Sequence, residues 1–394
     1  MPTIPLGKLL ATFILLKSLQ LTLLYFTPAQ FDTSSEIIVS QTKSPYGYVL
    51  THLLNRFIVW DSVYFNYLFV NGPKYEHQYV FCPNWLKFIR NFPIGGNGYY
   101  EKLFVSLVIS NALHFFSVIL LYVLTLRFFK NDSKMALHSS LLMIIAPAGI
   151  FLTASYSENA NNVLSLAQIL AYDIAVNPQD PTRNNTKSIV SKPLYLLSGF
   201  LVAVNYTIRA NSLLLGIPYL MDLFEIGVSQ EAAWPILSGG SLFLSFLWSN
   251  FEAYRTFCPQ RGEWCNNTLP ILFSYAQNKY WGVGFLQYWS PNNIPNFLIA
   301  LPVVAIHGLS IAYFWSRLPT LKKVLPWLVV NSVVITGGLF FWNVQILVRI
   351  TSFLPLSYWY VASLTGHQHK SLVYYMLIWN LLQTMLFSAF LPPA

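Results

Sequence analysis

The chain has 394 residues, of which 55% are hydrophobic and only 9% are charged, whereas roughly 25% of the residues in an ordinary soluble domain are charged. One soluble core could not bury so much apolar surface, so the composition excludes a soluble globular protein and indicates a chain solvated by lipid. The net charge of +9 comes from basic residues that stand singly in short loops. This distribution excludes the basic patch of a nucleic-acid-binding protein.

Residues 1–26 form an apolar stretch that contains Lys8 and Lys17. Both a cleaved signal peptide and an uncleaved first transmembrane helix fit such a stretch. The proline in Thr27-Pro28-Ala29 makes a poor cleavage site. We therefore expect an uncleaved helix.

Apolar stretches recur along the whole chain, and a helix needs about 20 apolar residues to cross the hydrocarbon. The stretches at 161–176, 194–208 and 353–366 are short for a span, so we expect an all-α integral membrane protein with nine to eleven transmembrane helices. The candidate spans are 8–26, 103–126, 136–154, 161–176, 194–208, 211–227, 234–251, 296–315, 324–342, 353–366 and 371–390.

Lysine and arginine collect in three loops, around residues 127–134, 183–192 and 317–323. The positive-inside rule places these loops, and with them the N-terminus, in the cytosol. Residues 27–102 and 252–295, here called the first and second extramembranous segments, then face the lumen. We expect one polytopic membrane domain over residues 1–394.

The cysteines and glycosylation sequons test this topology. Cys82, Cys258 and Cys265 all fall in the extramembranous segments. In an oxidising compartment Cys258 and Cys265 can close a small disulfide loop, and buried reduced thiols are the alternative. The sequon at Asn266 is expected to be glycosylated. The sequons at Asn131, Asn184 and Asn205 are expected to be silent, because they lie in cytosolic loops or beside a span.

Seven ionisable side chains are expected at the lumenal ends of the spans, where charges usually face a cavity or a pathway. Transporter charges cluster instead near the bilayer midplane. The lumenal edge therefore favours an active site. These residues are Asp61, Glu76, His77, Glu158, Arg209, Glu252 and Arg349.

Asp61 follows Trp60 early in the first extramembranous segment. A partly desolvated carboxylate can take a proton from a sugar hydroxyl as a general base. Asp is also a favoured helix N-cap, so a purely structural role is the alternative. Glu76 and His77 can bind an acceptor sugar or belong to a structural loop, and no ligand spacing resembles a zinc site.

Glu158 follows an apolar run and can orient hydroxyl groups, pair with an arginine, or sit at a helix N-terminus, where the helix dipole favours an acid. Arg209 and Arg349 can bind the phosphate of a lipid substrate. Their alternative role is to extend toward the lipid headgroups.

Three stretches, in order along the chain, resemble the PIG-V family of glycosylphosphatidylinositol (GPI) mannosyltransferases. The first consists of Trp60-Asp61-Ser62-Val63-Tyr64-Phe65 and then Glu76-His77-Gln78-Tyr79-Val80-Phe81. The second runs from Ala146-Pro147 to Ser155-Tyr156-Ser157-Glu158-Asn159. The third runs from Tyr280-Trp281-Gly282 to Gln287-Tyr288-Trp289 and is followed by Ile294-Pro295-Asn296-Phe297. After Asn159 come Ala160, Asn161 and Asn162, where apolar residues are expected, which leaves that helix boundary open.

The resemblance implies a GT-C glycosyltransferase with a lumenal active site in the endoplasmic reticulum membrane. It implies inverting transfer of the second, α-1,6-linked mannose from dolichyl phosphate mannose to a mannosyl-glucosaminyl-phosphatidylinositol acceptor. Asp61 matches the family's base, and no cofactor or metal is expected. Fungal members work with a small accessory membrane subunit. The residues expected to bind substrate are Trp60, Glu76, His77, Glu158, Asn159, Arg209, Trp281, Gln287, Tyr288 and Arg349.

Two other functions remain open at this stage. One is a related dolichyl-phosphate-sugar transferase with a different acceptor, which the motif at 280–289 would distinguish. The other is a lipid transporter or scaffold, which should survive the loss of Asp61.

Overall fold

The structure is a computed structural model and describes every residue except 1–2, 29, 81–82, 178–187, 261 and 394. Nearly all of the regular structure is helical. Cys82, the sequon at Asn184 and the basic residues Arg183 and Lys187 lie outside the described residues.

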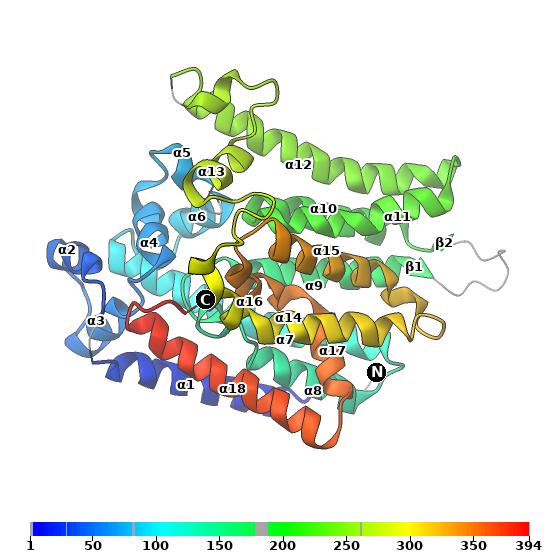
Figure 1. Cartoon of the computed structure of the whole chain (residues 1–394), viewed down its shortest axis with the longest axis horizontal. Helices are drawn as coiled ribbons and strands as arrows, with labels where there is room; N and C mark the ends of the chain where they lie inside the picture. The colour runs from blue at the N-terminus through cyan, green and yellow to red at the C-terminus, as the bar shows by residue number, and fades with distance from the viewer. Residues whose placement is uncertain (1–2, 29, 81–82, 178–187, 261, 394) are drawn as a thin grey trace.

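Long helices lie side by side in a bundle whose axis is horizontal in Figure 1. Their ends carry the expected signals: at the start of α7 the Glu101 carboxylate accepts the Gly98 N–H at 2.6 Å, and Asp132 caps α8 through the Met135 N–H at 2.9 Å. The helices of the bundle are α1 (Leu6–Phe26), α7 (Tyr99–Phe128), α8 (Ser133–Ile144), α9 (Glu158–Ala175), α10 (Lys192–Ile208), α11 (Ile217–Ile226), α12 (Ala233–Phe257), α14 (Ile294–Trp315), α15 (Leu325–Phe340), α17 (Pro355–Ser363) and α18 (Gly366–Ser388).

Short helices gather at one end of the bundle, at the left of Figure 1. They come from the two extramembranous segments, and they are α2 (Ser34–Gln41), α3 (Tyr48–Asn55), α4 (Asp61–Asn71), α5 (Glu76–Tyr79), α6 (Pro83–Asn91) and α13 (Leu272–Trp281). A further short helix, α16 (Leu347–Ile350), lies further into the bundle. Short 3-10 helices join the elements: η1 (Gly149–Leu152), η2 (Ala210–Gly216), η3 (Gln230–Ala232), η4 (Glu263–Asn266), η5 (Pro291–Asn293), η6 (Lys322–Val324), η7 (Val344–Ile346) and η8 (Thr351–Phe353).

The opposite end holds the basic loops at 127–134 and 317–323. Strands β1 (Val176–Asn177) and β2 (Ser188–Ile189) pair there in antiparallel register. Asp173 binds Arg127 at 2.7 Å and Lys323 at 3.5 Å. The loops at 127–134 and 317–323 therefore meet at one end, as the positive-inside rule requires, with the N-terminus beside them (Figure 1).

Not every expected span is a full transmembrane helix. Helix α17 has nine residues, and at 1.5 Å per residue it is too short to cross the hydrocarbon, which is about 30 Å thick. The expected span at 211–227 is divided between η2 and α11, and the span at 136–154 ends at Ile144. Among the described residues, four helices are long and apolar enough to cross a membrane by length and composition: α1, α7, α14 with η5, and α15 with η6.

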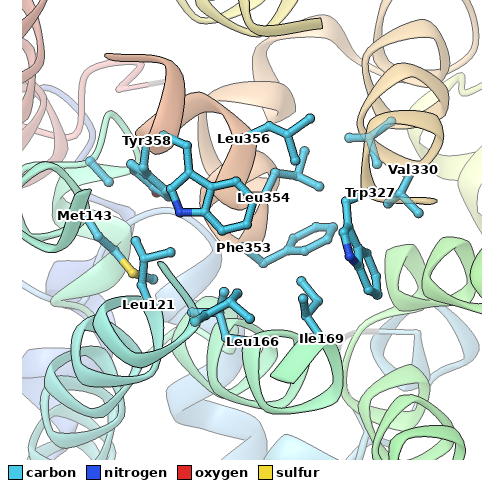
Figure 2. Packing of buried hydrophobic residues seen from close by; sticks show 14 of the residues in the cluster. Leu121, Met143, Leu166, Ile169, Trp327, Val330, Phe353, Leu354, Leu356 and Tyr358 are labelled. Carbon is cyan, nitrogen blue, oxygen red and sulfur yellow. The ribbon is translucent and has the colours of Figure 1, made fainter. Parts of the chain in front are cut away.

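The main hydrophobic core lies between α7, α8, α9, α15 and the chain from η8 to α17. Figure 2 shows Phe353 next to Leu166 and Ile169 of α9, with Trp327 of α15 to the side and Leu354 on the other side of Phe353. Residues of η8 are thus fixed in the core, which holds the preceding helix α16 in place.

Close helix packing accounts for the small residues in the bundle. A Cβ atom on Gly199 of α10 would lie 2.5 Å from the Ser238 Cβ of α12, so only glycine allows this approach. Transmembrane helices associate through such small-residue contacts because lipid offers no hydrophobic driving force between them.

Candidate active site

A cavity of about 880 Å³ opens beside the short helices, near the upper end of the usual range for ligand sites, roughly 300–1,000 Å³. Its wall includes Asp61 of α4, Arg209 at the end of α10, and Arg349 of α16. Residues of α12, α13, η2 and η7 contribute further to the lining. Residues that lie far apart in the sequence therefore share one cavity.

Asp61 is the first residue of α4 and follows Trp60, whose φ of 54° is unusual for a residue with a side chain. Trp60 itself occupies the N-cap position, and α4 has no side-chain cap bond. The interpretation of Asp61 as an N-cap is therefore wrong. Its side chain is 36% exposed and reaches the cavity.

Arg349 binds the Asp61 carboxylate: its Nη1 lies 2.9 Å from Asp61 Oδ2. Its guanidinium carbon also lies 4.8 Å from the ring centre of Phe151 and 5.5 Å from that of Tyr156. Such stacking on aromatic faces holds the flat guanidinium in one orientation. Around it in α16, Leu347, Val348 and Ile350 are buried, so the backbone that carries Arg349 is fixed.

Glu158 begins α9 and is almost completely buried. Its Oε1 lies 2.9 Å from Arg209 Nη1 and 3.7 Å from Arg349 Nε. Glu158 thus has two of its predicted roles, as the first acidic residue of a helix and as an arginine partner. The backbone of Arg209 is extended where α10 ends, which turns the side chain toward Ser157 and Glu158.

Asp61, Arg349, Glu158 and Arg209 therefore form a row of alternating charges with no net charge. The Arg209 and Arg349 side chains are only 11% and 18% exposed. Both arginines face the protein interior and the cavity, so the alternative that they extend to the lipid headgroups is wrong. An anionic group that enters the cavity meets both guanidinium groups, which can bind phosphate through paired N–H groups.

Most of the remaining lining is apolar, but amide and hydroxyl side chains lie among these residues and can bind a ligand rich in hydroxyl groups. Among the described residues, neither Asn211 Nδ2 nor Asn343 Oδ1 has a hydrogen-bond partner, and a bound ligand can supply one. Other residues of the lining were not predicted from the sequence: Tyr79, Tyr156, Asn250, Asn267, Ser274, Gln277 and Asn278.

A signal for some of these residues was present in the sequence. Asn250 stands near the end of an apolar run, and a polar residue in such a run usually faces the protein interior or a functional cavity. Gln277 and Asn278 follow Ser274 at a spacing of three and four residues, which places them on one helix face.

Comparison with known proteins decides the family. The family model described as "Mannosyltransferase (PIG-V)" matches residues 6–394. The chain belongs to the PIG-V mannosyltransferase family. The resemblance read from three ordered motifs is confirmed, and with it the glycosyltransferase class.

Relatives match the chain over almost its whole length. GPI mannosyltransferase 2 of Candida albicans is 49% identical, with 99% of this chain and 100% of the relative covered. GPI mannosyltransferase 2 of Saccharomyces cerevisiae is 35% identical, with 97% and 98% covered. Among solved structures, the oligosaccharyltransferase of Archaeoglobus fulgidus tethered with an acceptor peptide matches at 11% identity and a TM-score of 0.48, over 97% of this chain and 55% of that chain.

The first PIG-V motif is divided between the cavity and its surroundings. Asp61 lines the cavity, while the Trp60 ring packs 5.3 Å from Phe390. Glu76 accepts hydrogen bonds from Trp264 Nε1 at 3.0 Å and from the Tyr280 hydroxyl at 2.6 Å. The His77 ring lies 5.3 Å from that of Tyr280. Glu76 and His77 thus join the first extramembranous segment to the second.

The second PIG-V motif supplies both charge and support. Asn159 is fully buried, and its Nδ2 lies 2.9 Å from each of three acceptors, Ser110 O, Ser110 Oγ and Leu152 O. These contacts fix the start of α9 and so the position of Glu158. The following Asn161 and Asn162 are buried inside α9, where they accept hydrogen bonds from Ser212 and Ser352.

In the third PIG-V motif, Val283 lines the cavity, whereas Trp281, Gln287 and Tyr288 are not among the described lining residues. Trp281 ends α13 with its ring 6.0 Å from Tyr280, and Gln287 is exposed. The Tyr288 hydroxyl accepts a hydrogen bond from Asn296 at 2.7 Å. These residues support α13 and α14 around the site.

Cys258 and Cys265 form a disulfide bond with a Cα–Cα distance of 5.7 Å. Of the two alternatives for these cysteines, a disulfide bond and two reduced thiols, the structure has the disulfide bond. Within the described ranges, no three His, Cys, Asp or Glu side chains are grouped as metal ligands.

Proposed function

We propose that the chain transfers mannose from dolichyl phosphate mannose to a GPI precursor. One observation carries the proposal: Asp61 and the two arginines of the charge row line the same cavity. A carboxylate beside two cations matches a reaction that removes a proton from an acceptor hydroxyl and releases a phosphate.

In the proposed reaction, the acceptor O6 attacks the anomeric carbon of the donor mannose. The O6–H proton passes to the Asp61 carboxylate as the new C–O bond forms. The bond between the anomeric carbon and the phosphate oxygen breaks, and dolichyl phosphate leaves with the bonding electrons. Attack opposite the leaving group inverts the anomeric configuration and gives an α linkage from a β-linked donor.

Arg209 and Arg349 stabilise the negative charge that grows on the leaving phosphate. Because both guanidinium groups are already fixed by Glu158, Asp61 and the aromatic rings, they need little reorganisation during the reaction. We propose that these arginines act without a divalent metal, since a monophosphate leaving group needs less charge neutralisation than a diphosphate.

The acceptor is proposed from the relatives, which are named GPI mannosyltransferase 2. We assign to this chain the addition of the second, α-1,6-linked mannose to mannosyl-glucosaminyl-phosphatidylinositol. The cavity then faces the lumen of the endoplasmic reticulum, the N-terminus is cytosolic, and a small accessory membrane subunit assists the enzyme.

The test is transfer of radiolabelled mannose by the purified protein in liposomes. With dolichyl phosphate mannose and a one-mannose GPI precursor, we expect a two-mannose product that is sensitive to α-1,6-mannosidase. Transfer from a nucleotide sugar, or transfer only to a different acceptor, would refute the proposal.

A further inference from the structure

The Glu76 carboxylate lies where the two extramembranous segments meet. Its two oxygens accept hydrogen bonds from different parts of the second segment: Oε2 from Trp264 of η4 at 3.0 Å, and Oε1 from Tyr280 of α13 at 2.6 Å. The bond to Glu76 raises the pKa of Tyr280 to about 12, so this hydroxyl stays protonated and donates at physiological pH.

These contacts hold together two parts of the cavity lining. Tyr79 and Val80 follow Glu76 in the chain, and Gln277 and Asn278 precede Tyr280. All four residues line the cavity of Asp61. Glu76 therefore links the part of the cavity lining that comes from the first extramembranous segment to the part that comes from the second.

A small hydrophobic cluster, separate from the main core, lies beside this junction. It contains Tyr79 of α5, Phe257 of α12, Trp264 of η4 and Leu272 of α13. The disulfide between Cys258 and Cys265 closes the adjacent loop. A cluster of this size buries little apolar area. The directional hydrogen bonds to Glu76 therefore contribute much of what fixes the relative positions of these residues.

We propose that Glu76 is a positioning residue, which fixes α13 over the cavity so that Gln277 and Asn278 face the acceptor sugars. In this role the carboxylate contacts Trp264 and Tyr280 rather than the sugar. The inference rests on the proposed function for its catalytic effect, but the hydrogen bonds and their effect on α13 are independent of the reaction.

Kinetic measurements on Glu76→Ala, Tyr280→Phe and Trp264→Phe test the proposal. We expect Glu76→Ala to raise KM for the GPI acceptor about tenfold with little change in kcat, because two hydrogen bonds to a charged group are lost. Tyr280→Phe and Trp264→Phe remove one donor each and should give smaller rises in KM. Glu76→Gln keeps one acceptor oxygen, which can bind one of the two donors, and should recover part of the loss.

Glu263→Gln is the matched control. Glu263 lies in the same loop and pairs with Lys279 at 3.3 Å, but its side chain is 78% exposed. An exposed ion pair contributes little, so this variant should keep the wild-type KM.

The combination of Glu76→Ala with Tyr280→Phe separates positioning from direct sugar binding. If Glu76 acts through Tyr280, adding Tyr280→Phe to Glu76→Ala should change KM no further. If Glu76→Ala raises KM while Tyr280→Phe and Trp264→Phe do not, Glu76 binds the sugar itself and the proposal is wrong. A wild-type KM in all three single variants would also overturn it.

Hydrogen exchange of the purified protein without substrates provides a measurement that does not depend on activity. We expect faster exchange of the α13 amides in Glu76→Ala and Tyr280→Phe, with the control unchanged. If wild type shows no mannose transfer but this difference appears, the proposed function fails while the positioning role stands. Unchanged exchange in α13 would refute the positioning role even in an active enzyme.

Discussion

Arg349 Nη1 lies 2.9 Å from Asp61 Oδ2, although 288 residues separate the two in the sequence. The pair connects the first extramembranous segment to a short helix anchored in the main core. It also holds a carboxylate at the cavity wall beside a cation. The geometry thus fixes the position of the proposed base relative to the proposed phosphate site.

Replacement of Asp61 by Asn should lower mannose transfer by about 10²–10⁴-fold, the range expected for loss of a general base. The amide keeps the size of the side chain and can still accept a hydrogen bond from Arg349, but it cannot take up a proton. The measurement is transfer in membranes, normalised to the amount of protein, together with the GPI intermediate that accumulates. The one-mannose precursor should build up.

Asp132→Asn is a suitable control, because Asp132 is a true N-cap carboxylate and Asn caps a helix almost as well as Asp. It should keep wild-type activity. If Asp61→Asn retained more than roughly a tenth of wild-type activity, outside the range for a lost base, the base would have to be sought elsewhere.

Replacement of Arg209 by Met should lower both stability and activity. The change leaves the buried Glu158 carboxylate without its 2.9 Å partner, and removal of one member of a buried pair costs about 3 kcal/mol. Adding Glu158→Gln removes the uncompensated charge, so the double variant should recover much of its thermal stability in detergent. It should not recover mannose transfer, because the phosphate ligand is still missing.

The outcome separates a structural arginine from a functional one. If transfer returned together with thermal stability in the double variant, Arg209 would serve only to neutralise Glu158.

The orientation in the membrane can be tested at opposite ends of the molecule. Asn266 is exposed in η4, near the short helices, and we expect it to carry an N-linked glycan. A glycosylation tag inserted at 317–323, between α14 and α15, should remain unmodified. Shifts in gel mobility on glycosidase treatment give the answer, and a modified tag would reverse the orientation.

Chelation should leave the enzyme active. If Arg209 and Arg349 alone neutralise the leaving phosphate, transfer in excess EDTA should equal transfer in buffer with added Mg²⁺ or Mn²⁺. A known metal-dependent glycosyltransferase assayed in parallel would confirm that the chelator works. Activity lost in EDTA and restored by one cation would show that the arginines do not suffice.

Composition and motif order determined the class of the protein. The apolar stretches predicted a helical membrane protein, and most of them became helices close to the expected bounds, because a backbone in lipid must satisfy its own hydrogen bonds. Hydropathy alone did not determine how many of these helices span the membrane. The nine-residue helix α17 is apolar because it is buried in protein, and an apolar run does not distinguish burial in protein from contact with lipid.

The sequence also identified the charged residues, but only the tertiary structure decided their roles. Asp61, Glu158, Arg209 and Arg349 were each singled out because charges near a membrane span are costly. Glu76 was singled out on the same grounds, yet it bonds Trp264 and Tyr280 outside the row. Glu76 and Trp264 are 188 residues apart, and Asp61 and Arg349 are 288 residues apart, so the packing of the helices decides these pairs. The sequence shows that a charge near a span is unfavourable by itself, but it does not show which opposite charge or hydrogen-bond donor compensates that charge.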